Sequence, residues 1–300
     1  MDYSANSSLC QFSTSDAVGQ RNLLAETLEF NRGGTMTLHV LIPCSKSKNM
    51  PCGENLTWPS SDGIEGWRQS WKNTNSKVEA RDLYTGQTTK KQLQICSDKE
   101  DVKCYIISAG GGLIPATGRM IPSYEATFGK GTGPSPEEWS LLPEGGLENI
   151  NLGKDDTIVT FAPPNYQRVL TSDPLFEEYK AHLIVGSNSP LSKQAGVVLK
   201  VHERSKEVLK ASSRDANSKL LQIFLEEGAS GLKNIYSQCL VLPIKASRRK
   251  VTDEELSKEI TKVPNEIKRS ITKTVDYIRN NRGISAIDTR IRRALLEDRE

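Results

Sequence analysis

The chain has 300 residues and a mass of 33.2 kDa, of which 36% are hydrophobic, 6% aromatic and 26% charged. This length and composition exclude a lone helix, a coiled coil and a disordered chain. Forty basic and 37 acidic residues leave a net charge of +3, which neither demands nor excludes a polyanionic partner. The apolar runs are far shorter than the roughly 18 residues of a membrane helix. The start of the chain also lacks the basic and apolar parts of a signal peptide. We therefore expect a cytoplasmic protein with no membrane partner.

Cysteine and histidine spacing gives no sign of a metal site. The six cysteines form no CxxC pair, and none of the three histidines stands at ligand spacing. The sequence also lacks the GxxxxGK and GxGxxG motifs that bind nucleotide phosphates. We therefore expect free thiols in a reducing compartment, no metal and no cofactor.

In chain order, residues 1–34 are predicted to form a flexible leader with a short helix, and residues 35–244 an α/β core. Short apolar, β-branched runs, each followed by a polar loop, are typical of buried parallel strands. They lie at 35–43, 103–108, 156–161 and 182–185, with 196–202 either a fifth strand or the start of a helix. This pattern predicts a mostly parallel central sheet flanked by helices, with the ligand site beyond the carboxyl ends of the strands.

Two segments interrupt this pattern. Residues 52–78 hold three of the four tryptophans. The i,i+4 spacing of Trp67 and Trp71 favours packing on the core, and stacking on nucleic-acid bases is the alternative. Residues 129–154, rich in Gly, Pro and Glu, are predicted to form a loop without chemistry.

The C-terminal segment, 245–300, is expected to be helical and basic. Residues 245–293 carry 14 Lys and Arg against 7 Asp and Glu. Their apolar positions recur at three- and four-residue steps, which predicts amphipathic helix with a break near Pro264, and a last helix is expected over 284–297. Either the segment binds a phosphate backbone through Arg248, Arg249 and Lys250, or it is a solvated helical face docked on the core.

The loop after the first predicted strand, Cys44 to Asn49, combines hydroxyls with the ammonium groups of Lys46 and Lys48. Such a loop suits a phosphate or an anionic leaving group. In the segment 80–86, Arg81 stands beside Asp82, whose carboxylate could activate water or, alternatively, cap a helix.

A further loop, 108–113, contains three consecutive glycines, which permit close approach of a ligand to the backbone or form a plain tight turn. Tyr124 and Glu125 follow soon after it in the sequence. Tyr124 could stack on a base, and Glu125 could serve as a second acid or base.

These motifs, CSKSK, ARDLYTG, SAGGGLIPAT and IPSYE followed by Asn165-Tyr166, occur in the same order as in an uncharacterised bacterial domain family that they resemble. That family is grouped with the peroxide-stress DNA-binding protein, and the resemblance covers roughly residues 37–170. The loop beginning Pro43-Cys44-Ser45 is more weakly similar to the archaeosine synthase core, which modifies a deazaguanine base in tRNA. Gly111 and Gly112 depart from the family, which tends to carry a larger residue there, and we expect this to open a pocket.

A second resemblance lies in the segment SNSPLS, residues 187–192, after a predicted strand. It is similar to the HPSPLS loop of uracil-DNA glycosylases, which binds a flipped base and inserts a leucine into the duplex. Ser187 and Asn188 replace the usual histidine and proline, and the usual first-strand loop with its water-activating Asp is missing. The resemblance implies a uracil-DNA glycosylase-like core.

Together these features predict a DNA glycosylase that flips and excises a modified base, with a bulky phage-type modification suggested by Gly111, in antiviral defence. The alternatives are a non-catalytic DNA-binding stress or repair protein and a tRNA deazaguanine-modifying transferase. The partner is expected to be DNA, and a monomer is favoured. The predicted residues fall into three groups by role: catalytic Asp82, Lys48 and Ser45; base-binding Cys44, Gly111, Tyr124, Glu125, Ser187 and Asn188; and DNA-binding Lys46, Arg81, Ser189, Leu191, Ser192, Lys193, Arg248, Arg249 and Lys250.

Overall fold

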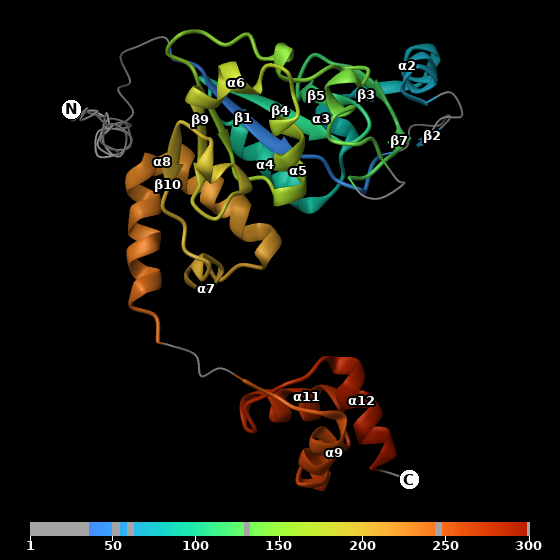
Figure 1. The fold of residues 1–300 in the computed structure, drawn as a ribbon, viewed down its shortest axis with the longest axis vertical. Coiled ribbons are helices and arrows are strands. Elements are labelled where there is room, and N and C mark those ends of the chain that lie inside the picture. Colours follow the sequence, from blue (N-terminus) through green and yellow to red (C-terminus); the bar gives the residue numbers. More distant parts are fainter. Residues whose placement is uncertain (1–35, 50–54, 59–62, 129–132, 244–247, 299–300) are drawn as a thin grey trace, which may run out of the picture. The chain divides into compact units, whose positions relative to one another are not determined.

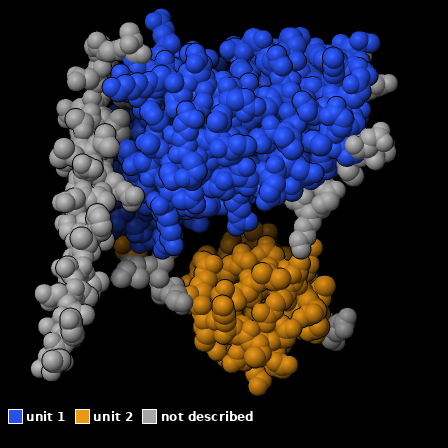
Figure 2. Space-filling view, turned by 45° about the horizontal axis from the view of Figure 1, so that its top comes forward, with its two compact units in different colours: residues 1–241 blue, residues 242–300 orange. Residues whose placement is uncertain are grey.

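The structure is a computed structural model that describes residues 36–49, 55–58, 63–128, 133–243 and 248–298. The chain divides into two compact units, residues 1–241 and residues 242–300, shown in different colours in Figure 2. The predicted leader, residues 1–34, lies outside the described residues, and so does the predicted boundary between residues 244 and 245. No helix in the described ranges has the length and apolar character needed to cross a membrane.

Unit 1 is built on a six-stranded sheet with the order β10-β9-β8-β1-β4-β5 (Figure 1). Its strands are β1 (Leu38–Pro43), β4 (Val102–Ser108), β5 (Gly112–Pro115), β8 (Thr157–Thr160), β9 (Leu183–Gly186) and β10 (Val197–Leu199). All neighbouring strands pair in parallel except β4 and β5, which are antiparallel. The predicted α/β class with a mainly parallel sheet is therefore confirmed, and residues 196–202 contribute a strand.

Helices and short ribbons surround this sheet. Helix α4 (Gln87–Ser97) packs against β1 and β4, and the long helix α8 (Ser213–Leu240) contacts α4 and β10. The other helices of unit 1 are α2 (Gly63–Asn73), α3 (Ala80–Leu83), α5 (Pro164–Thr171), α6 (Phe176–Tyr179) and α7 (Ser205–Val208), with 3-10 turns η1 (Trp139–Leu141), η2 (Leu147–Asn149), η3 (Lys180–His182) and η4 (Pro190–Lys193). Two small ribbons pair β2 (Leu56–Thr57) with β7 (Tyr124–Glu125) and β3 (Lys77–Glu79) with β6 (Met120–Pro122).

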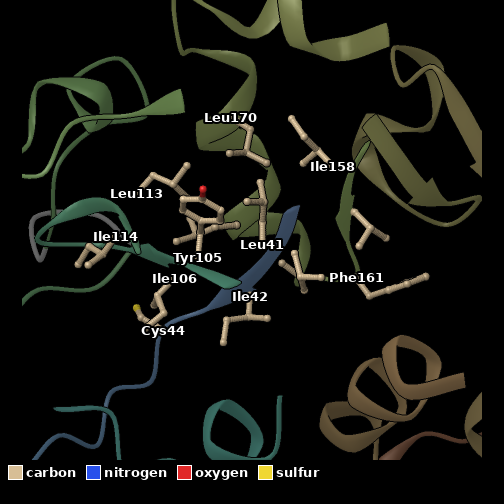
Figure 3. Close-up of a cluster of buried hydrophobic side chains, with 14 of the residues drawn as sticks. Leu41, Ile42, Cys44, Tyr105, Ile106, Leu113, Ile114, Ile158, Phe161 and Leu170 are labelled. Carbon is tan, nitrogen blue, oxygen red and sulfur yellow. The ribbon is translucent and has the colours of Figure 1, made fainter. Parts of the chain in front are cut away.

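The core of unit 1 follows from the apolar strand runs. All six residues of β1 are buried, as expected of a central strand covered on both faces. Figure 3 shows Leu41 and Ile42 of β1 among side chains from the neighbouring strands, including Ile106 of β4 and Ile158 of β8. This close-packed core fixes where each strand ends, and therefore where the loops beyond those ends begin.

A buried histidine–carboxylate contact lies near the start of β1. His39 is fully buried, and its Nε2 lies 3.2 Å from Oδ2 of Asp156. Asp156 also accepts hydrogen bonds from the backbone N–H groups of Thr37 and Gly153. Burial lowers the pKa of His39, outweighing the opposing effect of Asp156. Within the described residues, His39 Nδ1 has no hydrogen-bond partner, so a proton added there would be buried without an acceptor.

Unit 2 has its own hydrophobic core, formed by residues such as Leu256, Ile260, Ile278 and Ile291. Its elements are β11 (Arg249–Lys250), α9 (Asp253–Thr261), α10 (Asn265–Lys268), α11 (Ile271–Asn280), β12 (Ile284–Ser285) and α12 (Asp288–Glu297). The helix break predicted near Pro264 is confirmed between α9 and α10. The last helix begins at Asp288 rather than at residue 284, because residues 284–285 pair with β11.

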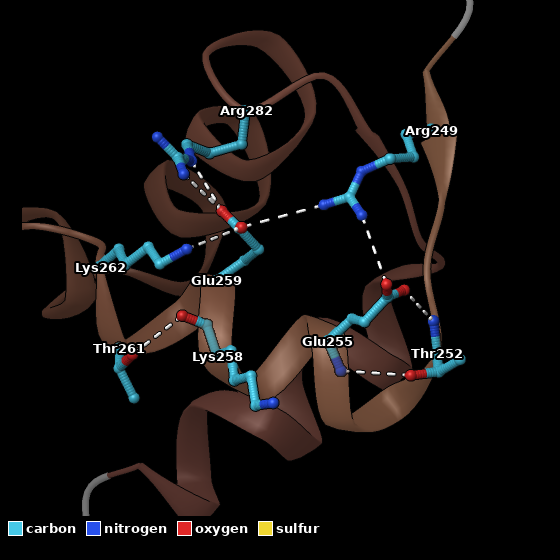
Figure 4. Close-up of polar contacts among 8 residues, drawn as sticks. All are labelled: Arg249, Thr252, Glu255, Lys258, Glu259, Thr261, Lys262 and Arg282. Carbon is cyan, nitrogen blue, oxygen red and sulfur yellow. Dashed lines mark hydrogen bonds and ion pairs between the residues drawn. The ribbon is translucent and has the colours of Figure 1, made fainter.

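Many cations of unit 2 are bound to its own acidic residues. Glu259 is nearly buried and pairs with Lys262 at 3.1 Å and with Arg282 at 2.7 Å (Figure 4). Arg249 pairs with Glu255 at 3.5 Å and lies 3.9 Å from Glu259. The excess of basic residues in the sequence therefore overstates the positive charge that this unit can offer to a phosphate backbone.

Candidate functional site

The candidate site lies at the carboxyl end of the sheet, where the chain reverses direction across it. From β1 the chain passes to β4 on one side, and it later returns to place β8 on the other side of β1. In open α/β sheets a ligand crevice forms beyond the strand ends at such a switch point. The loop after β1 and the residues after β8 meet here, since the Tyr166 hydroxyl donates to the Cys44 carbonyl oxygen at 3.0 Å. Tyr166 Oη also lies 3.7 Å from the Cys44 sulfur.

Lys48 is held over an aromatic ring in this loop. Its ammonium nitrogen lies 4.2 Å from the ring centre of Tyr124 and 6.0 Å from that of Tyr84. A backbone bridge between Lys48 and Tyr84, with a 2.6 Å hydrogen bond from the Asn49 N–H to the Leu83 carbonyl, fixes the loop beside α3. Burial lowers the pKa of Lys48, although negative charge at Cys44 and Glu125 opposes this change. The uncharged amine form of Lys48 is therefore more populated than that of an exposed lysine at the same pH.

The ring beneath Lys48 is fixed by a chain of buried hydroxyls. Tyr124 Oη lies 2.8 Å from Tyr84 Oη and 2.5 Å from Ser108 Oγ at the end of β4. Ser108 Oγ in turn accepts a hydrogen bond of 2.8 Å from the Gly111 N–H. Burial raises the pKa of both tyrosines, so both remain protonated donors. This chain ties the carboxyl end of β4 to α3 and to the ring that supports Lys48.

The three glycines serve close packing. A Cβ on Gly110 would lie 2.5 Å from the Tyr124 ring, and one on Gly111 would lie 2.6 Å from Ile114 and 3.0 Å from Trp71. The expectation that Gly111 and Gly112 open a pocket is therefore wrong, because side chains fill the space beside Gly111 and the Gly145 backbone fills that beside Gly112. Tyr124 is 1% exposed, so in this arrangement its ring supports Lys48 and offers no free face for a base.

The Trp-rich segment packs on this glycine loop. Trp67 donates a 2.7 Å hydrogen bond to the Gly110 carbonyl, and Trp71 packs at 5.3 Å from the Tyr124 ring centre. Both indoles are nearly fully buried, which confirms the packing interpretation of their spacing. The alternative, stacking of these two rings on bases, does not fit this arrangement.

The remaining residues of the first loop differ in role. Ser45 Oγ donates to the Ser47 carbonyl at 2.6 Å and accepts from the Gly86 N–H at 3.1 Å, so it links the loop to the start of α4. Cys44 is 7% exposed, whereas Lys46 is exposed. The structure thus brings Cys44 and Lys48 together beside Tyr124 and leaves Lys46 at the surface.

The two candidate carboxylates, Asp82 and Glu125, differ in the groups around them. Asp82 and Arg81 are exposed on α3, and within the described residues the Asp82 carboxylate has neither a hydrogen bond nor an ion pair. Asp82 does not cap that helix, since Glu79 is its N-cap residue. Glu125 is exposed next to Tyr124, and its charge acts on Lys48. Glu125 is therefore the predicted carboxylate that the structure couples to Lys48.

The SNSPLS loop follows β9, as expected, but its side chains are largely structural. Ser187 Oγ bridges both backbone groups of Val201, and Ser189 Oγ accepts from the Leu191 N–H and donates to Gln167. Leu191 is fully buried, so its predicted insertion into a duplex is wrong for this conformation. Exposed or partly exposed side chains remain for ligand contact: Asn188, Ser192 and Lys193.

The predicted DNA contacts of the C-terminal segment belong to unit 2. Arg249 is engaged by Glu255 and Glu259, Arg248 donates to the Asn280 side chain at 2.9 Å, and Lys250 is exposed. Among the residues that the structure describes, no three His, Cys, Asp or Glu side chains gather closely enough to hold a metal ion.

Sequence reasoning gave no role to two residues of the site, Tyr84 and Tyr166. Both lay inside motifs noted for resemblance, ARDLYTG and NY, but a tyrosine in a loop carries no sign of what its hydroxyl will bind. Their partners, Tyr124 and Cys44, are 40 and 122 residues away in the chain.

The fold is that of an α/β protein with a mainly parallel sheet, and Lys48 lies in the loop that follows the carboxyl end of its strand β1. Residues 70–190 match the model of a family of unknown function (DUF6884). This segment includes Trp71, Tyr84, Ser108, Tyr124 and Tyr166, whereas Cys44 and Lys48 precede it. No curated protein and no solved structure matched the chain.

Proposed function

We propose that the protein is a DNA N-glycosylase, with a core like that of the uracil-DNA glycosylases, that excises a modified base. The observation that carries this proposal is the placement of Lys48 in the loop after β1, with its ammonium nitrogen 4.2 Å from the Tyr124 ring centre and its pKa lowered by burial. The uncharged form of a lysine amine is a nucleophile, as in enzymes that form Schiff bases, and burial increases the share of that form. The packed glycines remove the reason to expect a bulky base, so the modification itself is left to the assay.

The proposed reaction uses the Lys48 amine at C1′ of the target nucleotide. The nitrogen forms a bond to C1′ while the bond from C1′ to the base breaks, and the base leaves with that electron pair and takes a proton. Lys48 gives up a proton, for which Glu125 is the nearby acceptor. The C1′–O4′ bond then opens, O4′ takes a proton and a C1′=N imine remains. Water hydrolyses the imine, freeing Lys48 and leaving an abasic site.

The competing route uses Asp82 to activate water directly, with no covalent intermediate. An exposed carboxylate without a protein partner is free to meet a substrate. In both routes the target base leaves its stack to reach the site. The two routes differ in one observable: only attack by Lys48 gives an imine that borohydride reduces to a permanent protein–DNA bond.

The test is incubation of the protein with plain, uracil-containing and hypermodified phage DNA, with and without sodium borohydride. We expect a covalent adduct on one modified substrate, and strand breaks at abasic sites after alkali. Lys48→Gln should abolish both, while Lys90→Gln, at an exposed position on α4, should retain them. Strand breaks without an adduct, lost in Asp82→Asn, would replace the lysine route with the water route.

No breaks and no adduct on any DNA, with binding retained, would overturn the glycosylase proposal in favour of a non-catalytic DNA-binding protein. Incorporation of a labelled base into tRNA under the same conditions would instead identify a base-modifying transferase.

A further inference from the structure

A second candidate site is a cavity of unit 1 whose lining includes Trp71 but not Lys48. It measures about 670 Å³ and opens between α2, the β3–β6 ribbon and the loop at 143–144. Its lining includes four cations, on Arg68, Lys72, Lys77 and Arg119, together with Trp71, Pro143 and Met120. None of these cations was assigned a role in the base-excision site.

The cavity lining has four cationic and two acidic residues, and each acidic residue pairs with one of the cations, which leaves Lys72 and Lys77 without an acidic partner in the lining. Both oxygens of Glu144 are engaged, one by the Trp71 indole N–H at 2.8 Å and the other by Arg119, and its side chain is 6% exposed. Glu65 lies 3.6 Å from Arg68, but both side chains are more than half exposed. An ion pair that exposed is weak and exchanges readily for a stronger anion.

The cations are arranged around an apolar wall. Arg68 and Lys72 stand four residues apart on α2 and so share a face of the helix. Lys77 Nζ is held beside that helix end by the Lys72 carbonyl at 3.3 Å. Met120 is 54% exposed and adds an apolar side chain to the cavity lining. Cationic groups next to an exposed apolar side chain suit a ligand with a phosphate and a flat aromatic ring face.

The geometry points to a second site, distinct from Lys48, that binds a nucleotide through its phosphate. The Trp71 ring centre lies 5.3 Å from that of Tyr124, and Lys48 Nζ lies 4.2 Å from the latter. Trp71 is therefore separated from Lys48 by no more than the sum of these distances. The cavity is therefore lined by a residue that lies close to the Lys48 site, and its ligand is a nucleotide of a DNA strand or a free nucleotide.

The experiment measures fluorescence anisotropy of a labelled oligothymidylate with the full chain, in competition with thymidine monophosphate and with thymidine. The pocket variant Arg68→Gln/Lys77→Gln is compared with a charge-matched control, Lys90→Gln/Lys91→Gln on exposed positions of α4. A second variant, Met120→Glu, adds a negative charge at an exposed site without removing a core contact. We expect about tenfold weaker binding or more in both pocket variants, a smaller salt slope in the double variant, and no change in the control.

The arms of the experiment separate the two sources of the ligand. If thymidine monophosphate displaces the oligonucleotide, the cavity is a site for a free nucleotide. If the oligonucleotide binds and the monophosphate does not displace it, the cavity is a site for a DNA strand. Thymidine competing as well as its monophosphate would overturn the phosphate assignment. Equal affinity of wild type, pocket variants and control would overturn the site itself. These outcomes are independent of borohydride trapping at Lys48, so failure of one proposal does not imply failure of the other.

Discussion

Replacing Tyr124 by Phe removes one hydroxyl from the centre of the buried chain that supports Lys48. That hydroxyl lies 2.8 Å from Tyr84 Oη and 2.5 Å from Ser108 Oγ, and all three side chains are at most 3% exposed. Each hydrogen bond contributes roughly 0.5–1.5 kcal/mol net, so losing two costs about 1–3 kcal/mol. For a unit of this size, each kcal/mol lowers the melting temperature by roughly 2–4 °C.

The assay is thermal unfolding of the full chain followed by circular dichroism. Tyr105→Phe is the matched control, because the Tyr105 hydroxyl makes no hydrogen bond within the described residues, and it should change stability by less than about 0.5 kcal/mol. The phenyl ring of Tyr124→Phe still supports Lys48, so trapping by borohydride should survive where stability falls. Equal melting temperatures for Tyr124→Phe and wild type would refute the view that this hydroxyl chain holds the site.

Two further predictions concern other parts of the chain. Because the pKa of His39 is lowered in the folded state, the unfolded state binds the proton more readily. The free energy of unfolding should therefore keep its full value above about pH 6.5. It should decline as pH falls toward the folded-state pKa, by up to about 1.4 kcal/mol per pH unit. Urea unfolding between pH 5 and 8 measures how the free energy of unfolding changes with pH. This dependence should be weaker than wild type in His39→Gln and unchanged in His202→Gln. An equal dependence in wild type and both variants would contradict the prediction. In unit 2, Thr252→Ala removes a capping box at the start of α9, where Thr252 Oγ1 accepts from the Glu255 N–H at 3.2 Å, and should cost about 1 kcal/mol. In Thr252→Ala, amide hydrogen exchange should speed up in α9 and α12 but not in β1 or β4. The control Thr272→Ala, at an exposed position of α11, should have little effect. Faster exchange throughout the sheet of unit 1 would show that the units do not unfold separately.

The strands of the sheet were predictable because each is a short apolar run that ends at a polar loop. The signal is local, and five runs gave β1, β4, β8, β9 and β10. Strand β5 was missed because its four residues, Gly112–Pro115, follow a glycine-rich turn and resemble loop in composition. Its pairing depends on β4, which is buried beside it, and no local pattern records that pairing.

The site was predictable in its location but less so in its contacts. The loops after β1, β4 and β9 carried polar residues, and a parallel sheet gathers such loops at one edge. The role of Tyr124 as a support for Lys48 depends on ring packing between residues 76 positions apart in the printed numbering. Leu191 was misplaced because the sequence SPLS does not show whether the leucine points toward solvent or core, and in the structure it is fully buried.

The aromatic cluster behind the glycine loop also gives the protein an optical signature. The Trp58 and Trp67 ring centres lie 5.3 Å apart at 74°, and those of Trp67 and Trp71 lie 6.1 Å apart at 50°. Indoles held in a fixed asymmetric array give a near-ultraviolet circular dichroism signal that is lost when tertiary packing loosens. Because Trp71 also contacts the ring under Lys48 and lines the second cavity, this signal reports on both regions without an added label. A change in this signal on adding DNA or a nucleotide would report binding near these indoles in the unmodified protein.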